Sequence, residues 1–280
     1  MGSLLAVDAA SQIRIANDPG EGRSNPLICK LESLAPLSQA DRSVLEQVSA
    51  SSYSLGQNTD LVREGGPLES AFLILEGIAC RYRLRADGAR QIMSYLVPGD
   101  LCDPDGTFLS RADHTIGTLS RCRVVRIPHD ALQPLMERHP GIVHALRLAK
   151  LVEEATLRER LVSLGCRSAI ERVAHLFCEL LVRHQATCLA KQNSFPLPIT
   201  QMDLADALGL SNVHVNRVLQ DLRKQRLVEF RRKALSILNL PRLRALAEFR
   251  ADYLHAMAAE KERPVPEKAS RPRDALTAYP

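Results

Sequence analysis

The sequence predicts an α+β protein with an N-terminal jelly-roll-like β-roll, a long dimerisation helix and a C-terminal winged helix-turn-helix domain. Three observations carry this prediction. Short runs rich in β-branched and aromatic residues alternate with turn signals between residues 50 and 128. A long helical pattern covers 142–164, and residues 199–217 have the pattern of two short helices joined by a tight turn.

Composition is consistent with two modest domains in a chain of 280 residues. The hydrophobic share of 45% and charged share of 25% are ordinary for a globular protein. No apolar run approaches the roughly 20 residues needed to cross a bilayer, so no membrane partner is expected. The seven cysteines are odd in number and scattered singly, which argues against a secreted disulfide framework. We therefore expect a cytoplasmic protein with reduced thiols.

The first predicted segments are a flexible tail over 1–24 and a β-roll domain over 25–138. Met1-Gly2 opens a myristoylation pattern, but Ala6 stands where that pattern needs Ser or Thr. Helical signals follow over 25–47, with Ser38 as a cap. The expected strands are 72–75, 78–84, 91–97, 115–119 and 124–127. Asp87-Gly88 between two of them predicts a hairpin.

A dimerisation helix and hinge are predicted over 139–167. Pro140 suits a first helical position, and Gly165 is expected to end the helix. One apolar stripe contains Ile142, Leu146, Ala149, Val152 and Ala155, and the other side carries Leu148, Leu151 and Val162. The second stripe favours contact with a second subunit, although both stripes could be covered within one chain. Ser168 and Glu171 form a capping box that opens the next helix.

The winged helix-turn-helix domain is predicted over 168–258, with a linker at 193–198 and a disordered tail over 259–280. Thr200 and Asp203 have the spacing of a capping box, and Gly209 lies where the turn needs a residue that tolerates positive φ. Ser211 then caps a second helix, about 212–225. Its buried stripe is expected to be Val215, Val218, Leu219 and Leu222.

The remaining polar positions of this motif are the candidate DNA contacts. Strand-like runs at 227–230 and 235–240 bracket a basic turn, which predicts a β-wing, and Pro241 starts a last helix. Residues 200–250 contain ten Lys or Arg and five acids, the charge footprint expected of phosphate binding. The predicted DNA-binding residues are Thr200, Gln201, Ser211, Asn212, Val213, His214, Asn216, Arg217, Gln220, Arg231, Arg232 and Lys233.

The order of these parts resembles the Crp/Fnr family of bacterial transcription regulators over about residues 28–240. The residues that carry the resemblance are Phe72-Leu-Ile-Leu-Glu76-Gly77, Pro98-Gly99-Asp100, and Ile199 through Arg217. The resemblance implies a homodimer on a palindromic double-stranded DNA site. It also implies RNA polymerase as a partner and a signal in the β-roll that shifts the DNA-binding domains.

Two departures from the family pattern affect the expected specificity and effector. Arg217 stands where members carry a base-reading arginine, but Val213 replaces a common glutamate, so the half-site is expected to differ. The family's phosphate-binding Gly-Glu and Arg-Ser pairs are absent. The corresponding positions hold Asp103-Pro104-Asp105-Gly106 and His114-Thr115. Cyclic AMP is therefore not expected, because acidic side chains repel a phosphate.

The oxygen-sensing branch of the family holds an iron–sulfur cluster through a tight N-terminal cysteine set. Only Cys29 lies near that region, so a cluster is not expected either, and the effector is unidentified. No catalytic residue and no cofactor is predicted.

Two competing readings stay open. One is a metal- or thiol-dependent enzyme built around the Asp103–His114 loop, where Cys102, Asp103, Asp105 and His114 could ligate a metal. The calcium-loop pattern fails there because its first position is Leu101. The other is a ligand-binding adaptor whose winged helix serves protein contacts.

Overall fold

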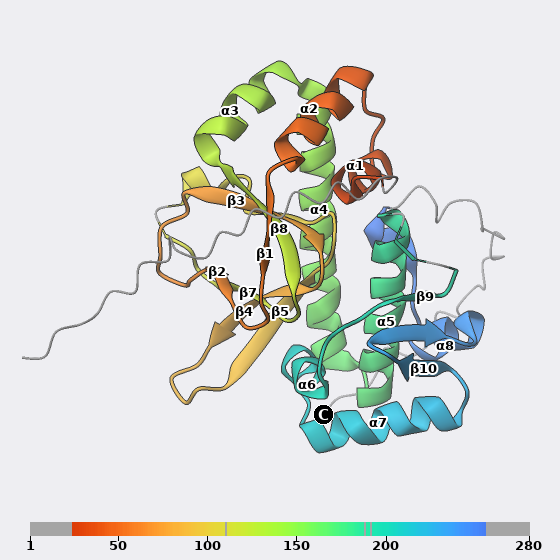
Figure 1. The fold of residues 1–280 in the computed structure, drawn as a ribbon. Helices are drawn as coiled ribbons and strands as arrows, with labels where there is room; N and C mark the ends of the chain where they lie inside the picture. The colour runs from red at the N-terminus through yellow and green to blue at the C-terminus, as the bar shows by residue number, and fades with distance from the viewer. Residues whose placement is uncertain (1–23, 110, 188, 191, 256–280) are drawn as a thin grey trace, which may run out of the picture.

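The computed structural model describes residues 24–109, 111–187, 189–190 and 192–255. Two predicted segments lie outside these residues: the N-terminal tail with its Met1-Gly2 pattern, except for residue 24, and the C-terminal tail over 259–280. The chain forms a β-roll that packs beside the long helix α4, with the C-terminal region, residues 168–255, below and beside it (Figure 1).

Two short helices precede the β-roll, as the sequence predicts. Helix α1 (Pro26–Glu32) begins after Asn25, whose side chain accepts a hydrogen bond from the Leu27 amide. Helix α2 (Gln39–Ser49) begins after Ser38, which forms a capping box with Asp41. The capping groups satisfy amides of the first turn that have no partner within the helix.

Two four-stranded antiparallel sheets form the β-roll, in the orders β1-β8-β3-β6 and β2-β7-β4-β5. The strands are β1 (Ser52–Leu55), β2 (Asp60–Val62), β3 (Ser70–Glu76), β4 (Ala79–Leu84), β5 (Arg90–Leu96), β6 (Leu101–Cys102), β7 (Thr115–Thr118) and β8 (Cys122–Pro128). β4 and β5 pair as the predicted hairpin, and Gly88 in its turn has a φ of +83°. A positive φ at this turn suits glycine.

Several elements of this half were not predicted. β1, β2 and β6 contain only four, three and two residues, too few to give a clear alternation of apolar and polar side chains. Helix α3 (His129–Arg138) was also missed, because Pro134 stands inside it. A 3-10 turn, η1 (Gly106–Phe108), lies between β6 and β7.

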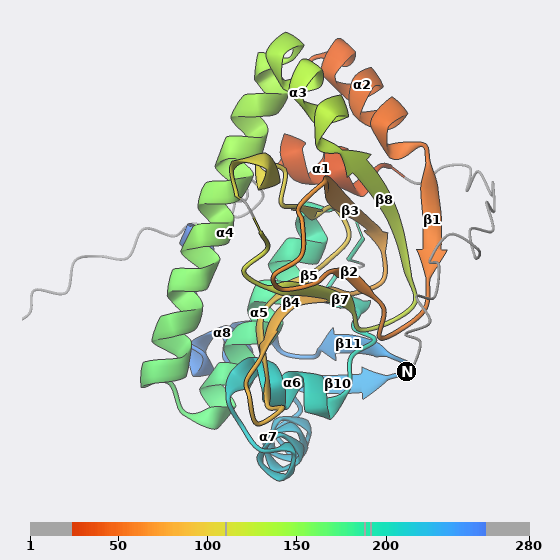
Figure 2. The same ribbon diagram turned by 90° about the vertical axis from the view of Figure 1, so that its left-hand side faces the viewer.

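Helix α4 (Pro140–Cys166) runs along the side of the molecule and passes both the β-roll and the C-terminal region (Figure 2). Pro140 occupies its first turn, as expected. The prediction that Gly165 ends the helix was wrong, because α4 includes Gly165 and Cys166 before the chain extends at Arg167. Helix α5 (Ala169–Ala186) follows, with the Ser168 amide donating to Glu171 over 2.7 Å.

The C-terminal region contains the predicted pair of helices and wing. Its elements are β9 (Ser194–Pro196), α6 (Gln201–Leu208), α7 (Asn212–Lys224), β10 (Val228–Arg231), β11 (Ala234–Ile237), α8 (Leu240–Leu246) and the 3-10 turn η2 (Ala251–Leu254). The segment expected to be a plain linker contains β9, which joins the wing to make a sheet in the order β10-β11-β9. The second wing strand ends at Ile237, before the predicted Leu240.

One hydrophobic cluster runs through both halves of the molecule. It joins Ile92 and Tyr95 of β5 to Phe177 of α5, Leu204 of α6 and Leu222 of α7. Tyr95 is fully buried within it. The β-roll and the C-terminal region therefore share a core. Among the helices that the structure describes, none has the length and apolar character to cross a membrane.

Candidate nucleic-acid interface

Helix α6 is fixed at both ends by local hydrogen bonds. The Thr200 amide donates to Asp203 Oδ2 over 2.8 Å, and the Asp203 amide donates to Thr200 Oγ1 over 3.1 Å, the capping box expected from the sequence. At the other end Gly209 adopts a φ of +62°, as predicted. Arg172 of α5 donates to the Leu208 carbonyl, which satisfies an otherwise unpaired group of the last turn.

Helix α7 presents one buried and one exposed face. Ser211 caps it by accepting a hydrogen bond from the His214 amide over 3.2 Å. The four residues predicted for the buried stripe are all buried: Val215, Val218, Leu219 and Leu222. Because this stripe is anchored against the core, the opposite face of α7 is held toward solvent.

Seven of the residues predicted to contact DNA lie in α7 or at its N-cap. All seven are exposed: Ser211, Asn212, Val213, His214, Asn216, Arg217 and Gln220. Val213 is 72% exposed although it is apolar. Gln220 donates to Asn216 over 2.9 Å, so these two side chains present one joined polar surface. Thr200 is exposed and Gln201 half-buried at the start of α6.

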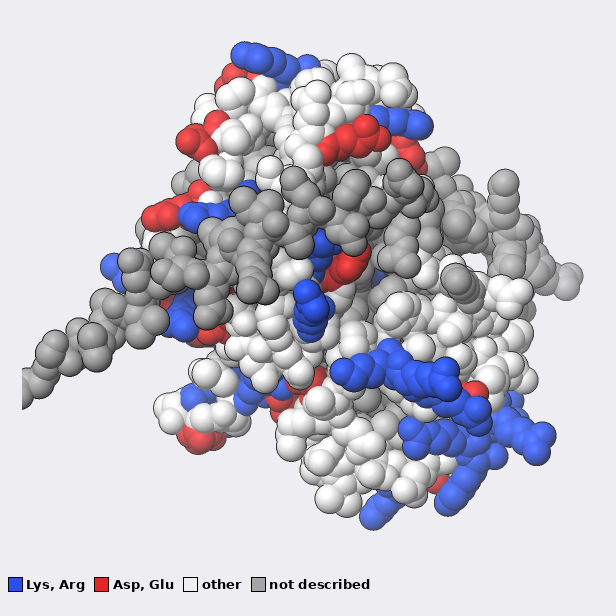
Figure 3. Space-filling model, in the orientation of Figure 1, with Lys and Arg blue, Asp and Glu red and all other residues white. Residues whose placement is uncertain are grey.

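The wing supplies a separate basic surface. Arg231, Arg232 and Lys233 are exposed, and Arg232 and Lys233 form the turn with φ values of +50° and +60°. Arg231 pairs with Glu229 over 2.8 Å. Lys and Arg side chains gather over the part of the surface that carries the end of α7, the wing and α8 (Figure 3). A concentration of positive charge of this kind attracts a polyanion.

Residues of the β-roll that the sequence reasoning missed hold α6 in place. Arg90 of β5 donates through Nη2 to Asp203 over 2.6 Å and through Nε to Asp206 over 2.7 Å. The adjacent Gln91 donates to the Asp206 carbonyl, and the Tyr95 hydroxyl donates to the Asp203 carbonyl over 2.9 Å. These partners are more than 100 positions apart in the chain. Their pairing therefore had no local sequence signal.

The acidic loop of the β-roll is internally paired. His114 lies 2.6 Å from Asp113 through Nδ1 and 3.5 Å from Asp103 through Nε2. Burial lowers the pKa of His114, but hydrogen bonds to Asp103 and Asp113 outweigh burial and raise it above 6.5. Arg81 binds both Asp103 and Glu153 of α4. The Arg81 guanidinium is thus occupied by carboxylates.

The four residues considered as metal ligands do not form a cluster. Cys102 is buried within the sheet, where burial raises the pKa of its thiol well above 9.0. Asp105 pairs instead with Lys150 over 2.8 Å. No group of three metal-ligating side chains is found in the described ranges.

Two protein-family models match the two halves of the chain. The cyclic nucleotide-binding domain matches residues 54–139, and the Crp-like helix-turn-helix domain matches residues 171–246. The first match covers the β-roll and α3, and the second runs from α5 to α8.

Curated relatives align with more than half of the chain. The nitrogen fixation regulation protein FixK of Bradyrhizobium diazoefficiens is 31% identical over 180 residues, which cover 64% of this chain and 74% of that protein. The transcriptional activator protein FnrL of Cereibacter sphaeroides is 30% identical over 64% of this chain and 73% of its own length. The transcriptional activatory protein AadR of Rhodopseudomonas palustris is 28% identical over 78% of this chain and 91% of its own length.

Solved structures share the fold. FixK2 from Bradyrhizobium japonicum superposes with a TM-score of 0.61 at 24% identity, covering 70% of this chain and 96% of that one. TTHB099, a CRP-family transcriptional regulator from Thermus thermophilus, superposes with a TM-score of 0.56 at 17% identity. The match covers 70% of this chain and 96% of that one.

Proposed function

The chain belongs to the Crp/Fnr family of DNA-binding transcription regulators, and we propose that it acts as a homodimer that reads a palindromic site through α7. Members of this family regulate transcription and are not enzymes, so the enzyme reading of the Asp103–His114 loop has no support. The adaptor hypothesis is also disfavoured, because the helix-turn-helix matches the Crp-like type.

The observation that carries the proposal is the exposed face of α7. A helix that enters the major groove needs polar side chains on its outward face and an anchored inner face, and α7 has both. Arg217 is expected to donate two guanidinium N–H groups to O6 and N7 of a guanine. Val213, one turn earlier, is expected to contact a thymine methyl group, since valine accepts no hydrogen bond.

The other predicted contacts surround this face. Asn212, His214, Asn216 and Gln220 are placed to reach base edges or phosphates from α7. Thr200 and Gln201 lie at the start of α6, and Ser211 at the start of α7, where helix amides attract phosphate. Arg231, Arg232 and Lys233 would bind the backbone beside the major groove.

Helix α4 supports the homodimer. Four of its apolar side chains are at least 41% exposed: Leu151, Leu157, Leu161 and Val162. Leu151 and Val162 belong to the stripe that the sequence assigned to a second subunit. Apolar side chains that recur along one long helix are suited to burial against the same helix of a partner.

We take the functional organisation to be a β-roll sensor over 25–138, a dimerisation helix and hinge over 139–167, and a DNA-binding domain over 168–258. RNA polymerase is the further partner, and the cytoplasm is the site of action. The β-roll responds to an effector other than a cyclic nucleotide. This is supported by the acidic loop and by the engagement of Arg81 with Asp103 and Glu153.

Selection of bound sequences from random DNA tests the proposal. The wild-type protein is expected to enrich an inverted repeat with half-sites about 34 Å apart, one helical turn. Arg217→Ala should retain weak, salt-sensitive binding and lose sequence preference. Arg217→Lys keeps the charge but not the bidentate geometry, so it should lose guanine preference while it binds more tightly than Arg217→Ala.

Two results would overturn the proposal. Enrichment of the same repeat by Arg217→Lys and the wild type would show that Arg217 does not read a base. Enrichment of a single asymmetric half-site would contradict the homodimer.

A further inference from the structure

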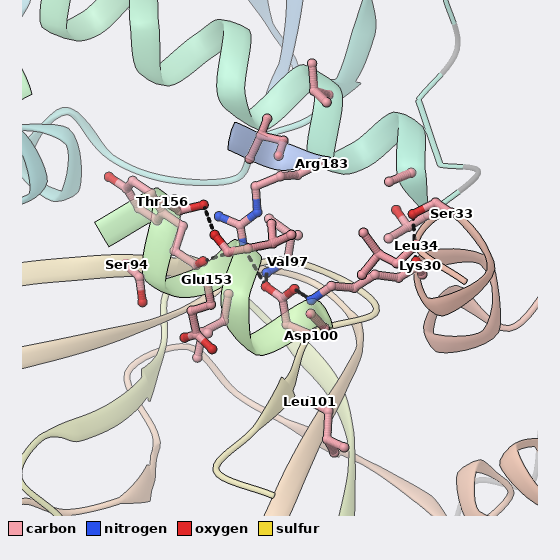
Figure 4. Close-up of a pocket in the computed structure, with 18 of the residues that line it drawn as sticks. Lys30, Ser33, Leu34, Ser94, Val97, Asp100, Leu101, Glu153, Thr156 and Arg183 are labelled. Atoms are coloured by element: carbon pink, nitrogen blue, oxygen red, sulfur yellow. Dashed lines mark hydrogen bonds and ion pairs between the residues drawn. The ribbon is translucent and has the colours of Figure 1, made fainter. Parts of the chain in front are cut away.

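A pocket lies where the β-roll, α1, α4 and α5 meet, and we call it the junction pocket (Figure 4). It has a volume of about 80 Å³. Lys30 and Leu34 line it from α1 and the turn after it, Val97 and Asp100 from the turn after β5, and Arg183 from α5. The pocket is separate from the acidic loop at residues 103–114, of which it contains no residue.

The polar end of the junction pocket is built around the Asp100 carboxylate. Lys30 Nζ lies 2.6 Å from Asp100 Oδ1, and Arg183 Nη2 lies 2.7 Å from Asp100 Oδ2. The Val97 amide also donates to this carboxylate over 2.8 Å. Although burial raises the pKa of Asp100, the charges of Lys30 and Arg183 outweigh burial and lower it to about 2. Asp100 is therefore ionised and fully engaged.

The ion-pair chain continues away from the pocket into the molecule. Arg183 Nη1 lies 3.6 Å from Glu179 Oε1, and Arg160 lies 3.5 Å from the same oxygen. Lys30, Arg183 and Arg160 thus share two carboxylates, those of Asp100 and Glu179. The chain holds one positive charge in excess, and most of its members are less than 20% exposed. Each cation of these ion pairs has a carboxylate partner, but the positive charges outnumber the carboxylates by one, so this end of the pocket favours an anion.

Lys30 lines the pocket and has hydrogen-bonding capacity left for a ligand. A lysine ammonium has three donors, and within the part of the chain that the structure describes Lys30 Nζ donates to Asp100 alone. Its side chain is 25% exposed, more than that of Asp100 or Arg183. Arg183 already donates to the Tyr95 carbonyl as well as to Asp100.

Most of the remaining wall is apolar, and its apolar side chains are those of Leu34, Ala149, Val152, Leu157, Val182 and Leu254. The wall also carries the polar side chains of Ser33, Ser94, Thr156 and Thr187 and the guanidinium of Arg81. Glu153 also lines the wall, but it is bound to Arg81 and repels a second anion. The negative group of a ligand is therefore confined to the Lys30 end, while its body contacts the apolar wall.

We propose that the junction pocket binds a small monocarboxylate with an apolar chain. The carboxylate pairs with Lys30 and supplies the negative charge that the Lys30–Asp100–Arg183–Glu179–Arg160 chain lacks. The apolar chain of the ligand packs on Leu34, Val152 and Leu157. Binding at this pocket does not depend on the proposed DNA recognition. Because Arg183 belongs to α5, the ligand lies at the contact between the β-roll and the DNA-binding domain.

Calorimetric titration of the full-length protein without DNA tests the site with three probes. Hexanoate has the charge and the chain, hexan-1-ol has the chain alone, and acetate has the charge alone. We expect one saturable site per chain for hexanoate, with a Kd at least about ten-fold lower than for either of the other probes. Equal affinity for hexanoate and hexan-1-ol, or no saturable binding of hexanoate, would overturn the proposal.

Variants locate the site. Lys30→Met should weaken hexanoate binding about ten-fold or more and leave hexan-1-ol binding unchanged. Lys150→Met is the matched control, because Lys150 is exposed, pairs with Asp105 and does not line this pocket. Leu34→Trp should fill the pocket and remove binding of both probes, which gives a test that does not depend on removing a charge. Wild-type hexanoate affinity in Lys30→Met or Leu34→Trp would place the ligand elsewhere.

Discussion

Arg90 and Asp203 form an ion pair of 2.6 Å across 113 positions of the chain. The other oxygen of the Asp203 carboxylate accepts hydrogen bonds from the amide and hydroxyl of Thr200. One side chain, 7% exposed, therefore both starts the first helix of the DNA-binding motif and attaches that helix to the β-roll. This carboxylate therefore joins β5 to the start of α6.

Arg90→Ala is expected to reduce the free energy of unfolding by about 2 kcal/mol, because hydrogen bonds to a largely buried carboxylate are lost. Urea unfolding measures this change. Arg85→Ala is the control, since Arg85 is 76% exposed and lies 3.6 Å from Asp87. It should change stability by no more than about 0.5 kcal/mol. Equal effects of the two substitutions would show that the Arg90 pair contributes nothing specific.

Gly209→Ala should cost about 1 kcal/mol, because the φ of +62° is unfavourable for a residue with a Cβ atom. A Cβ atom there would lie 3.6 Å from Leu164, an ordinary contact, so the loss comes from the backbone. Gly209→Asn should lose less, since asparagine tolerates the left-handed region better. Thermal unfolding of both variants measures the difference. Identical losses would contradict the backbone explanation.

The double substitution Arg232→Ala with Lys233→Ala should weaken DNA binding about equally for selected and scrambled duplexes. If each residue neutralises one phosphate, the slope of log K against log salt falls by about 1.8. Fluorescence anisotropy at several salt concentrations measures both quantities. A loss restricted to the selected duplex would mean that the wing reads bases instead of the backbone.

If α4 forms the proposed dimer interface, Leu161→Glu is expected to give a monomer, because Leu161 is 71% exposed and a charge there cannot be buried against a partner. Sedimentation velocity measures the oligomeric state. Leu84→Glu provides the control at another exposed leucine, which is 57% exposed and lies on β4. If Leu161→Glu sediments as the wild type does, the dimer interface does not involve this part of α4.

His114 predicts a pH dependence of stability. Its pKa is raised in the folded state, so its contribution is fully present below about pH 6.5 and is lost as pH rises through the folded pKa. The pKa values of Asp103 and Asp113 are lowered, and their contributions are lost only on acidification below 3.8. The stability difference between wild type and His114→Asn should therefore shrink from about pH 5.5 to about pH 8.5. Urea unfolding across this range measures it, and a constant difference would show that His114 is not charged in the fold.

The elements that the sequence predicted are those with a local signal. The buried stripe of α7 follows from helical periodicity, and the caps at Ser38, Thr200 and Ser211 follow from side chains within three residues. The same reasoning could not find α3, whose Pro134 breaks the pattern. It could not assign β9 either, because that strand forms only by pairing with Leu235 and its neighbours.

The residues of the predicted site also divide into those with a local sequence signal and those without one. The outward residues of α7 could be identified because the inward ones were apolar. The attachment of α6 by Arg90 and the Lys30–Asp100–Arg183 pairs could not, since each joins elements 70 or more positions apart. Contacts of this length depend on the assembled fold and have no periodicity in the chain.

The shared core of the β-roll and the C-terminal region has a consequence for folding cooperativity. Tyr95 is fully buried against residues of α5 and α6, so separating the two halves exposes apolar surface on both. The protein is therefore expected to melt in a single transition instead of two. A fragment that began at Ser168 is expected to carry an uncovered apolar face and to be prone to aggregate, because the β-roll and the C-terminal region are expected to fold as one unit.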